Sequence, residues 1–186
     1  MVEKHRCSWV NLNNSDYIKY HDEVWGVELH DDKRLFLELS MEILQAGLKY
    51  ETVYNKREDI ILAFDGFDPY LVMGFDSLKI NELLNNKNII RSVGKIRAII
   101  NNARVFIDIQ RKYNSFNNYI WHFTNNKVIV ECGRNKSFLS DMVCSDLKSL
   151  GMRGIGSITI YSYLSAIGVI NAHEECCYLR KMRCKQ

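Results

Sequence analysis

The chain has 186 residues, of which 47% are hydrophobic and 25% are charged, and its formal net charge at pH 7 is +3. This composition is that of an ordinary soluble globular protein, and the length suits one domain or two small lobes that share a core. The chain has no run of about 18 apolar residues and no N-terminal secretory signal, so we expect a cytoplasmic protein that spans no membrane.

Helical periodicity runs along most of the chain, and start and stop signals divide it into separate helices. Asp31 and Asp32 precede the first long apolar run, residues 35–48, and either aspartate can cap its start. Further along, Asp68 followed by Pro69 is a helix start, because proline suits the first helical position. These signals predict one helix that begins near Asp32 and another that begins at Pro69.

The middle of the chain continues the helical pattern. Asp76 precedes a short predicted helix, 77–84, and Ser115 precedes another, 116–123. Between them, residues 95–112 are the most clearly amphipathic stretch, with apolar residues at the i, i+3, i+4 and i+7 positions of one face. We interpret the charged residues on its other face as a solvated surface.

The last third of the chain predicts two more helices and one short extended piece. Residues 127–131, KVIVE, follow two asparagines and can be extended. The helical pattern returns over 140–150 and stops at Gly151, a residue suited to the position after a helix end. A final helix is predicted over 157–167. The predicted fold class is therefore all-α, in a single compact domain that covers residues 1–186.

The six cysteines are expected to be reduced in the cytoplasm, so metal binding is favoured over disulfide bonds. Cys132, Cys144 and Cys184 have no histidine nearby in the sequence, and we interpret them as core or surface cysteines. The other three cysteines, at positions 7, 176 and 177, are the candidates for a metal site.

Cys7, His21, His173 and Cys177 form a candidate metal site. His173 and Cys177 are four residues apart, so on a helical turn they share a face and can bind the same ion. A structural zinc ion needs four ligands, and Cys7 and His21 near the other end of the chain would complete the set. Cys176 is an alternative ligand, and buried thiols with hydrogen-bonded histidines are the alternative to a metal site altogether.

A glycine-rich turn joins the last two predicted helices, in LGMRGIGSITIYSYL at 150–164. Gly154 and Gly156 allow positive φ angles and close approach of the backbone to another group. The helix that starts at Ser157 presents N–H groups at its N-terminus, which can bind a DNA phosphate without reading the base. In a mildly basic helical chain this pattern favours a helix-hairpin-helix phosphate clamp, although a plain link between two helices has the same sequence form.

Glu42 lies in a predicted helix with apolar residues on all sides, LFLELSMEILQAGL. A carboxylate buried there needs a hydrogen-bonding or charged partner. Glu38, one turn earlier, is a competing candidate, and either glutamate can instead lie on a narrow exposed stripe. Aromatic residues on which a planar base can stack occur in the same third of the chain, at Trp9, Tyr20, Trp25 and Tyr50. A carboxylate among such rings can accept a hydrogen bond from the exocyclic amine of a base.

Several motifs occur in one order along the chain: CSW (7–9), YHDEVWGV (20–27), LF (35–36), MEILQAGL (41–48), the glycine-rich hairpin and HxxxC (173–177). Over residues 5–178 they resemble the 3-methyladenine DNA glycosylase I family of base-excision repair. YHDxxWG followed by ExxQAGL is specific to that family, whereas the hairpin and HxxxC are weak signals alone. The resemblance implies a helix-hairpin-helix glycosylase fold, with two helical lobes flanking a base pocket.

The resemblance also implies roles for single residues at the pocket. Glu42, as the catalytic residue, and Tyr20 would hydrogen-bond the damaged base. Trp9 and Trp25 would line the pocket, and Tyr50 would stack on the base. The resemblance further implies a structural zinc ion that joins the two terminal segments, with the ligands Cys7, His21, His173 and Cys177.

Contacts to DNA are implied in two places. The loop Gly47-Leu48-Lys49 would enter the DNA near the lesion, with Leu48 as the wedge. In the hairpin, the backbone grip would come from Arg153, Gly154, Gly156 and Ser157.

The sequence departs from the family pattern at two points. The family usually has serine and tryptophan after QAGL, where this chain has Lys49 and Tyr50. A tyrosine still offers a π face, but a smaller one with a hydroxyl to satisfy. The hairpin usually carries a GFKFVG-like run, whereas this chain has GMRGIG, in which Arg153 can replace the missing lysine charge.

The reaction that the resemblance implies is hydrolysis of the N-glycosidic bond of 3-methyladenine in alkylated double-stranded DNA, which releases the free base. Flipping the nucleotide out of the duplex costs a few kcal/mol. The damaged base carries a positive charge, so π faces and Glu42 can select it over neutral adenine. Many relatives in the wider superfamily carry a catalytic aspartate after the hairpin, and its absence here fits what the resemblance implies for this family. We therefore expect a monofunctional enzyme without lyase activity, and we also expect a monomer.

Two rival functions follow from the same residues. One is a zinc-stabilised helix-hairpin-helix module that binds DNA without catalysis, its pocket degenerate at Tyr50. The other is a zinc hydrolase of small molecules, which needs an open coordination position and for which no HExxH helix exists in the chain.

Overall fold

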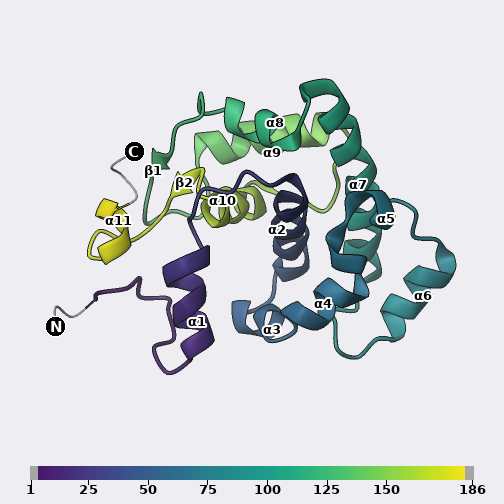
Figure 1. Ribbon diagram of the computed structural model, residues 1–186, viewed down its shortest axis with the longest axis horizontal. Coiled ribbons are helices and arrows are strands. Elements are labelled where there is room, and N and C mark those ends of the chain that lie inside the picture. Colours follow the sequence, from purple (N-terminus) through teal and green to yellow (C-terminus); the bar gives the residue numbers. More distant parts are fainter. Residues whose placement is uncertain (1–3, 183–186) are drawn as a thin grey trace.

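The computed structural model describes residues 4–182, and almost every element in that range is a helix (Figure 1). The predicted helical class is confirmed. The helices are α1 (Ser15–Lys19), the π-helix η1 (Tyr20–Val24), α2 (Asp32–Gln45), α3 (Tyr50–Tyr54), α4 (Arg57–Ala63), the 3-10 helix η2 (Asp65–Phe67), α5 (Pro69–Val72), α6 (Ser77–Asn85), α7 (Val93–Tyr113), α8 (Phe116–His122), α9 (Phe138–Ser149), α10 (Ser157–Ala166) and α11 (Tyr178–Met182).

Two short strands depart from a purely helical chain. β1 (Ile129–Val130) and β2 (Ile170–Asn171) pair in parallel, with Ile129 opposite Ile170. The predicted extended piece over 127–131 is therefore confirmed, and its partner comes from the segment after α10. This pairing attaches the loop before α9 to the segment that leads to α11. The interpretation of Cys184 as a core or surface cysteine lies outside the described residues.

The helix starts follow the predicted caps. The side chain of Asp31 accepts a hydrogen bond from the N–H of Arg34 at 2.9 Å, so Asp31 caps α2. Asp32 is already inside the helix and has another role, because its carboxylate accepts N–H bonds from Phe116 and Asn117, both at 2.8 Å. It thereby ties α2 to the start of α8. The other predicted caps, each of which accepts a backbone N–H, are Asp68, Asp76 and Ser115.

The first long helix ends earlier than its apolar run predicts. α2 ends at Gln45, and Gly47 takes a left-handed φ of +78°, which turns the chain away from the helix axis. Lys95 on α7 donates to the carbonyls of Leu44 and Ala46, at 2.6 and 2.7 Å. These bonds satisfy carbonyls at the helix end that have no partner within α2. The loop after Gln45 is therefore fixed to α7 and not free.

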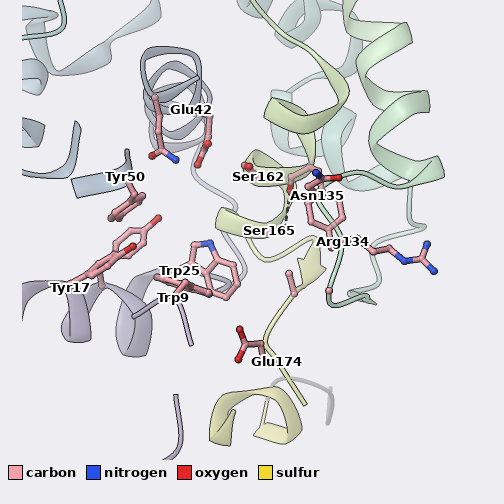
Figure 2. A pocket seen from close by; sticks show the side chains of 15 residues that line it. Trp9, Tyr17, Trp25, Glu42, Tyr50, Arg134, Asn135, Ser162, Ser165 and Glu174 are labelled. Carbon is pink, nitrogen blue, oxygen red and sulfur yellow. Dashed lines mark hydrogen bonds between the residues drawn. The ribbon is translucent and has the colours of Figure 1, made fainter. Parts of the chain in front are cut away.

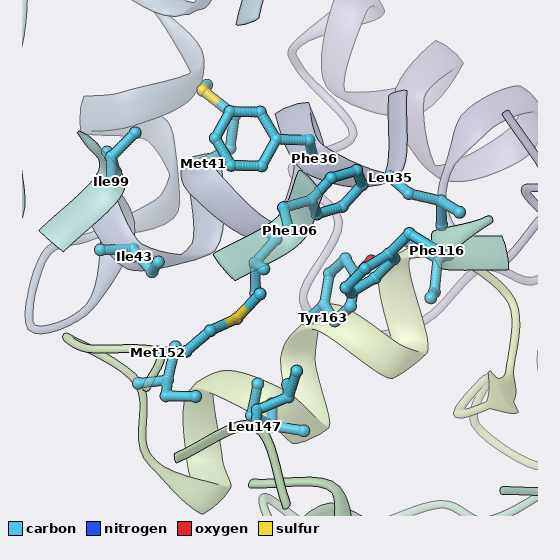
Figure 3. Packing of buried hydrophobic residues seen from close by; sticks show 14 of the residues in the cluster. Leu35, Phe36, Met41, Ile43, Ile99, Phe106, Phe116, Leu147, Met152 and Tyr163 are labelled. Carbon is cyan, nitrogen blue, oxygen red and sulfur yellow. The ribbon is translucent and has the colours of Figure 1, made fainter. Parts of the chain in front are cut away.

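Helix α2 lies at the centre of the molecule, between α7 and α10 (Figure 1). Figure 3 shows the packing around it, where the ring of Phe36 meets Phe106 of α7 at 5.1 Å between centroids. Phe106 in turn stacks on Phe116 at 4.1 Å. Each large side chain buried in this way contributes about 1.5–3 kcal/mol. Because α2 is packed on most sides, its two glutamates, Glu38 and Glu42, are placed in or near the interior.

No helix within residues 4–182 is both long enough and apolar enough to cross a membrane. The segment before α1 and the helix α11 lie at the same end of the molecule (Figure 1). The N–H of Tyr178 donates to the carbonyl of His5 at 2.9 Å, so the two ends of the described chain are directly bonded.

Candidate functional site

A cavity of about 690 Å³ opens between the N-terminal segment, α2, α3 and α10 (Figure 2). The five residues predicted for the base pocket all line it: Trp9, Tyr20, Trp25, Glu42 and Tyr50. Figure 2 shows aromatic rings along one side, Glu42 above them, and Ser162, Ser165 and Asn135 on the opposite side. Such a volume, with an apolar wall and a few convergent polar groups, is typical of a small-molecule or base pocket.

The aromatic wall consists of two groups of rings. Trp9 and Trp25 meet edge to face, with their centroids 5.0 Å apart. Tyr50 stacks on Tyr17 at 4.8 Å with an interplanar angle of 18°, and on Tyr54 at 5.5 Å. Tyr50 therefore lines the cavity as part of a tyrosine stack, and its faces are shared with neighbouring rings. A base that entered would meet the Tyr17–Tyr50 pair and not an isolated Tyr50 ring.

Glu42 extends from α2 into the cavity and keeps partial exposure there. The pKa of its carboxyl is raised from 4.5 to about 8, because burial and, to a smaller degree, the charge of Glu38 raise it more than the positive charge of Arg57 lowers it. At neutral pH the carboxyl of the empty cavity is therefore mainly protonated. A cation placed beside it would favour the ionised form, so Glu42 is suited to bind a positively charged ligand.

Glu38, the competing candidate, has a different environment. Its carboxylate is 2.5 Å from Nη2 of Arg57, the first residue of α4, and its side chain is buried. Glu38 is not among the residues that line the large cavity. The two glutamates of α2 are thus distinguished by their partners, because one is neutralised by an arginine and the other faces the cavity.

The π-helix η1 carries both Tyr20, which lines the cavity, and His21, which belongs to the candidate metal site. The N–H of Trp25 donates to the carbonyl of Tyr20 at 2.8 Å, the i to i+5 bond of a π-turn. Tyr20 lines the cavity, whereas His21 is fully buried among the candidate metal ligands. Neighbouring residues of a helix point in different directions, so one turn supplies a side chain to each site.

The four predicted metal ligands come together. One ligand atom from each of Cys7, His21, His173 and Cys177 lies within 4.8 Å of the others, and all four residues are buried. Sγ of Cys7 is 3.5 Å from Nδ1 of His173, and Sγ of Cys177 is 3.5 Å from the same nitrogen and 3.6 Å from Nε2 of His21. This cluster can hold a metal ion. The alternative ligand Cys176 is exposed and lies outside it.

The partners of the cluster fix its orientation. Nδ1 of His21 is 2.8 Å from the carboxylate of Asp22, which also forms a 2.7 Å ion pair with Arg6. A carboxylate on the outer nitrogen of a ligand histidine sets the tautomer and the ring orientation and directs the other nitrogen toward the metal site. The ring of His173 meets Trp25 edge to face at 4.7 Å, so the cluster and the cavity share a wall.

The glycine-rich turn joins α9 to α10 as predicted, and α7 holds it in place. The side chain of Asn102, buried in α7, accepts the N–H of Arg153 and donates to its carbonyl, both at 2.8 Å. Gly154 has a φ of +69°, whereas Gly156 has an extended φ of −142°. Gly154 therefore uses the positive φ that glycine permits, and Gly156 does not. Ser157 begins α10, and Arg153 is exposed.

The loop after α2 lies at the edge of the cavity. Gln45 and Tyr50 on either side of it both line the cavity. Between them, Leu48 is 41% exposed and Lys49 is exposed as well. An exposed leucine at the edge of the cavity has the placement that a wedge residue needs.

Sequence reasoning missed several lining residues. Tyr17 lies on α1 and lines the cavity. Its spacing of three residues from Tyr20 is the signal that could have identified it. Along α10 the spacing of Tyr161, Ser162 and Ser165 marks one helix face, a signal that was readable in the sequence. The loop residues Gly133, Arg134 and Asn135 carry no periodic signal, and only the β1–β2 pairing brings them to the cavity.

Comparison with known proteins gives consistent relatives. A family model described as methyladenine glycosylase matches residues 9–181. The chain is 36% identical over 181 residues to DNA-3-methyladenine glycosylase 1 of Escherichia coli K12, covering 93% of this chain and 96% of that protein. It is 34% identical over 178 residues to a DNA-3-methyladenine glycosylase of Haemophilus influenzae, covering 92% and 96%.

Solved structures agree with the sequence relatives. A crystal structure of 3-methyladenine DNA glycosylase I superposes with a TM-score of 0.89 at 34% identity, covering 94% of this chain and 98% of that one. A second solved structure concerns 3-methyladenine recognition by 3-methyladenine DNA glycosylase I from Staphylococcus aureus. It superposes with a TM-score of 0.89 at 30% identity, covering 94% of this chain and 96% of that one.

Proposed function

The chain belongs to the 3-methyladenine DNA glycosylase I family and is an enzyme of that type, and we propose that its large cavity is the pocket for the excised base. The substrate is alkylated double-stranded DNA, and the product is free 3-methyladenine. The observation that carries this assignment is the placement of Glu42 in the lining of an aromatic-walled cavity. A cationic purine fits that combination, because rings and a carboxylate both attract positive charge.

Within the pocket each residue has a distinct role. Glu42 accepts a hydrogen bond from the exocyclic amine of the base and supplies the negative charge opposite its ring. Tyr20 lies next to it and provides a hydroxyl for a second hydrogen bond. Trp9 and Trp25 close the wall, and the Tyr17–Tyr50 stack supports this proposal by presenting a planar surface at the position where the family pattern has tryptophan.

We propose DNA contacts at two places, the loop after α2 and the glycine-rich turn before α10. Leu48 enters the duplex as a wedge beside Lys49, and so helps to hold the target nucleotide outside the stack. The turn from Arg153 to Ser157 acts as a helix-hairpin-helix clamp on the phosphate backbone, through Gly154, Gly156 and the N-terminus of α10. The clamp of Asn102 on the turn supports this role, because a rigid turn loses little entropy on binding.

The reaction balances without a covalent enzyme intermediate. The bond between C1′ of the deoxyribose and the ring nitrogen breaks, and its electron pair remains with the base. The cationic ring thereby becomes neutral 3-methyladenine. The oxygen of a water molecule bonds to C1′ and releases a proton, which leaves an abasic site in an unbroken strand. No lysine of the chain is assigned as a nucleophile, in keeping with a monofunctional hydrolase.

We also propose that the Cys/His cluster binds a structural zinc ion. With Zn–S bonds of about 2.3 Å and Zn–N bonds of about 2.0–2.1 Å, sulfur and nitrogen ligands of one tetrahedron lie about 3.6 Å apart. The corresponding distances among Cys7, His173, Cys177 and His21 are 3.5, 3.5 and 3.6 Å, which supports the assignment. Four protein ligands leave no position for water, so the ion would hold the terminal segments together and take no part in catalysis.

Excision from methylated DNA tests the proposed function. Purified protein should release 3-methyladenine, identified by chromatography, and Glu42→Gln should lower the excision rate by about 100-fold or more because the charge opposite the base is lost. The amide keeps the shape of the side chain, so its far-UV circular dichroism should match the wild type. Binding of DNA without base release by the wild type would leave only the non-catalytic module. Full activity of Glu42→Gln would contradict the site.

Two expectations stay predictions. The chain is expected to act as a monomer, which size-exclusion chromatography with light scattering would measure. It is also expected to reside in the cytoplasm, where its DNA substrate and reduced cysteines would both be found.

A further inference from the structure

A buried ion pair lies beside the proposed pocket. The carboxylate of Glu38 on α2 is 2.5 Å from the guanidinium of Arg57 on α4, and their side chains are only 9% and 21% exposed. Removing two charges from water is costly, so such a pair stabilises a fold little more than apolar residues of the same size would. Its location next to a functional glutamate calls for a role other than stability.

The pair acts on Glu42 through its position. Glu38 and Glu42 are one helical turn apart and share a face of α2. The negative charge of Glu38 raises the pKa of Glu42 beyond the effect of burial, and the positive charge of Arg57 lowers it. The two partners of one ion pair therefore influence the same carboxyl in opposite directions.

Other described groups around Glu42 act on it less. The carboxylate of Glu174 lines the same cavity, but it accepts the N–H and the hydroxyl of Ser8. Tyr20 and Tyr50 remain neutral because burial raises the pKa of each phenol. The ammonium of Lys95 on α7 is bound by two carbonyls of the α2 end. Arg134 lines the same cavity, but its side chain extends away from Glu42 in Figure 2. On α10, Tyr163 is fully buried, and burial raises its pKa well above the ordinary value.

Resting on the proposed function, we propose that Glu38 and Arg57 are positioning residues that set the charge state of Glu42, so that it is neutral in the empty pocket and ionised only when a cationic base enters. Arg57 cancels the charge of Glu38, which does not line the cavity, so that Glu42 is the carboxyl that meets the base. Glu38 in turn keeps Arg57 from holding Glu42 permanently ionised. A neutral adenine brings no charge that could ionise Glu42, so the pair makes the pocket selective for cationic purines.

The same arrangement favours release of the product. When the glycosidic bond breaks, its electron pair neutralises the purine ring, and the ionised Glu42 loses its charged partner. The carboxyl then takes up a proton from solvent and returns to its neutral resting form. The proton that left Glu42 as the base entered is thereby recovered, so the cycle changes no net charge on the enzyme.

The pH profile of kcat/KM on DNA that contains 3-methyladenine tests this role, after subtraction of spontaneous base loss. The profile of kcat/KM reports ionisations of the free enzyme. The wild type should lose activity below a midpoint near the pKa of Glu42, about 8. In Glu38→Gln this midpoint should move down by roughly one pH unit, and in Arg57→Met it should move up by a similar amount. The control Asp108→Asn removes an exposed carboxylate on α7 and should leave the midpoint unchanged.

Opposite shifts distinguish this role from a structural one. If the pair served only to hold α2 against α4, both variants would be less stable and less active, but the midpoint of their pH profiles would equal that of the wild type. In that case the inference would be wrong. Should Arg57→Met fail to fold, Arg57→Lys keeps the charge, and its midpoint must stay near that of the wild type. Carboxyl ¹³C shifts of labelled glutamate, assigned with Glu42→Gln, give the same midpoints without catalysis. Absence of excision by the wild type would instead refute the proposed function.

Discussion

At the scale of single residues, the roles of the two glutamates of α2 depend on their partners, because Glu38 pairs with Arg57 and Glu42 lines the cavity. The apolar surroundings of Glu42 and Glu38 were readable from the helix pattern, but not which glutamate faces the pocket. That difference depends on Arg57, which lies on another helix and reaches Glu38 only in the folded chain. Motifs located Trp9 and Trp25, whereas Tyr17 became visible only through its stacking on the pocket wall.

The raised pKa of Glu42 predicts how stability depends on pH. Its pKa is about 8 in the folded protein and 4.5 in its ordinary environment. Between these values the unfolded chain ionises Glu42 and the folded chain does not, so rising pH favours unfolding. Relative to Glu42→Gln, the wild type should lose unfolding free energy steadily from about pH 4.5 to about pH 8 and no more above that.

Urea unfolding of both proteins at pH 5, 6.5 and 8 measures this difference. The glutamine variant has no carboxyl at that position. The difference in unfolding free energy between the two proteins therefore removes the pH dependence that all other groups contribute to both. A difference in unfolding free energy that stayed constant across this range would mean that Glu42 already ionises normally in the folded protein.

At the scale of elements, caps and periodicity predicted the long helices, but they did not predict where α2 ends or which distant segments pair. The signals at Asp31 and Ser115 placed helix starts correctly, because each side chain bonds an N–H of its own first turn. The end of α2 was misplaced, since a run of apolar residues continues past Gly47, whose left-handed φ turns the chain. The π-turn at Tyr20 and the pairing of β1 with β2 depend on contacts between distant segments and leave no periodic pattern.

The hairpin turn provides a test at this scale. A Cβ on Gly154 would lie 2.8 Å from the Cβ of Ala98 and 3.5 Å from Cγ2 of Ile43, and its φ of +69° is left-handed. Gly154→Ala should therefore lower the unfolding free energy by roughly 2–5 kcal/mol, combining about 1–2 for the backbone and about 1–3 for overpacking.

Gly156→Ala is the matched control for that substitution. A Cβ there would meet nothing within 4 Å, and its φ of −142° suits any residue, so the loss should stay below about 1 kcal/mol. Urea midpoints of the two variants measure the contrast. Equal losses would show that the turn is not seated against α2 and α7 as described.

At the scale of the whole molecule, the candidate metal site joins the two ends of the chain and supports the pocket. Spacing alone suggested His173 with Cys177, but nothing in the sequence required Cys7 and His21 to reach them. In the structure the connection is reinforced by Glu174, whose carboxylate accepts the N–H and the hydroxyl of Ser8 at 2.9 and 2.6 Å. Because Glu174 also lines the cavity, the closure of the termini forms part of its wall.

Loss of one metal ligand should therefore affect both stability and the pocket. Cys177→Ala should lose bound zinc, measured by elemental analysis, and should lower the melting temperature. Binding to the folded state alone stabilises a protein by about 4 kcal/mol when the free ion exceeds its Kd a thousandfold, and that contribution would be absent. Because His173 contacts Trp25 at 4.7 Å, the tryptophan fluorescence of the variant should change as well.

The neighbouring cysteine separates a ligand effect from a general effect of losing a thiol. Cys176 is exposed and lies outside the cluster, so Cys176→Ala should keep the zinc content, the melting temperature and the fluorescence of the wild type. Chelation of the wild type should reproduce the Cys177→Ala result, since it removes the ion and leaves every side chain in place. If Cys177→Ala kept its full zinc content, the four residues would not be the ligands, and the terminal closure would rest on direct contacts such as the Ser8–Glu174 and His5–Tyr178 bonds.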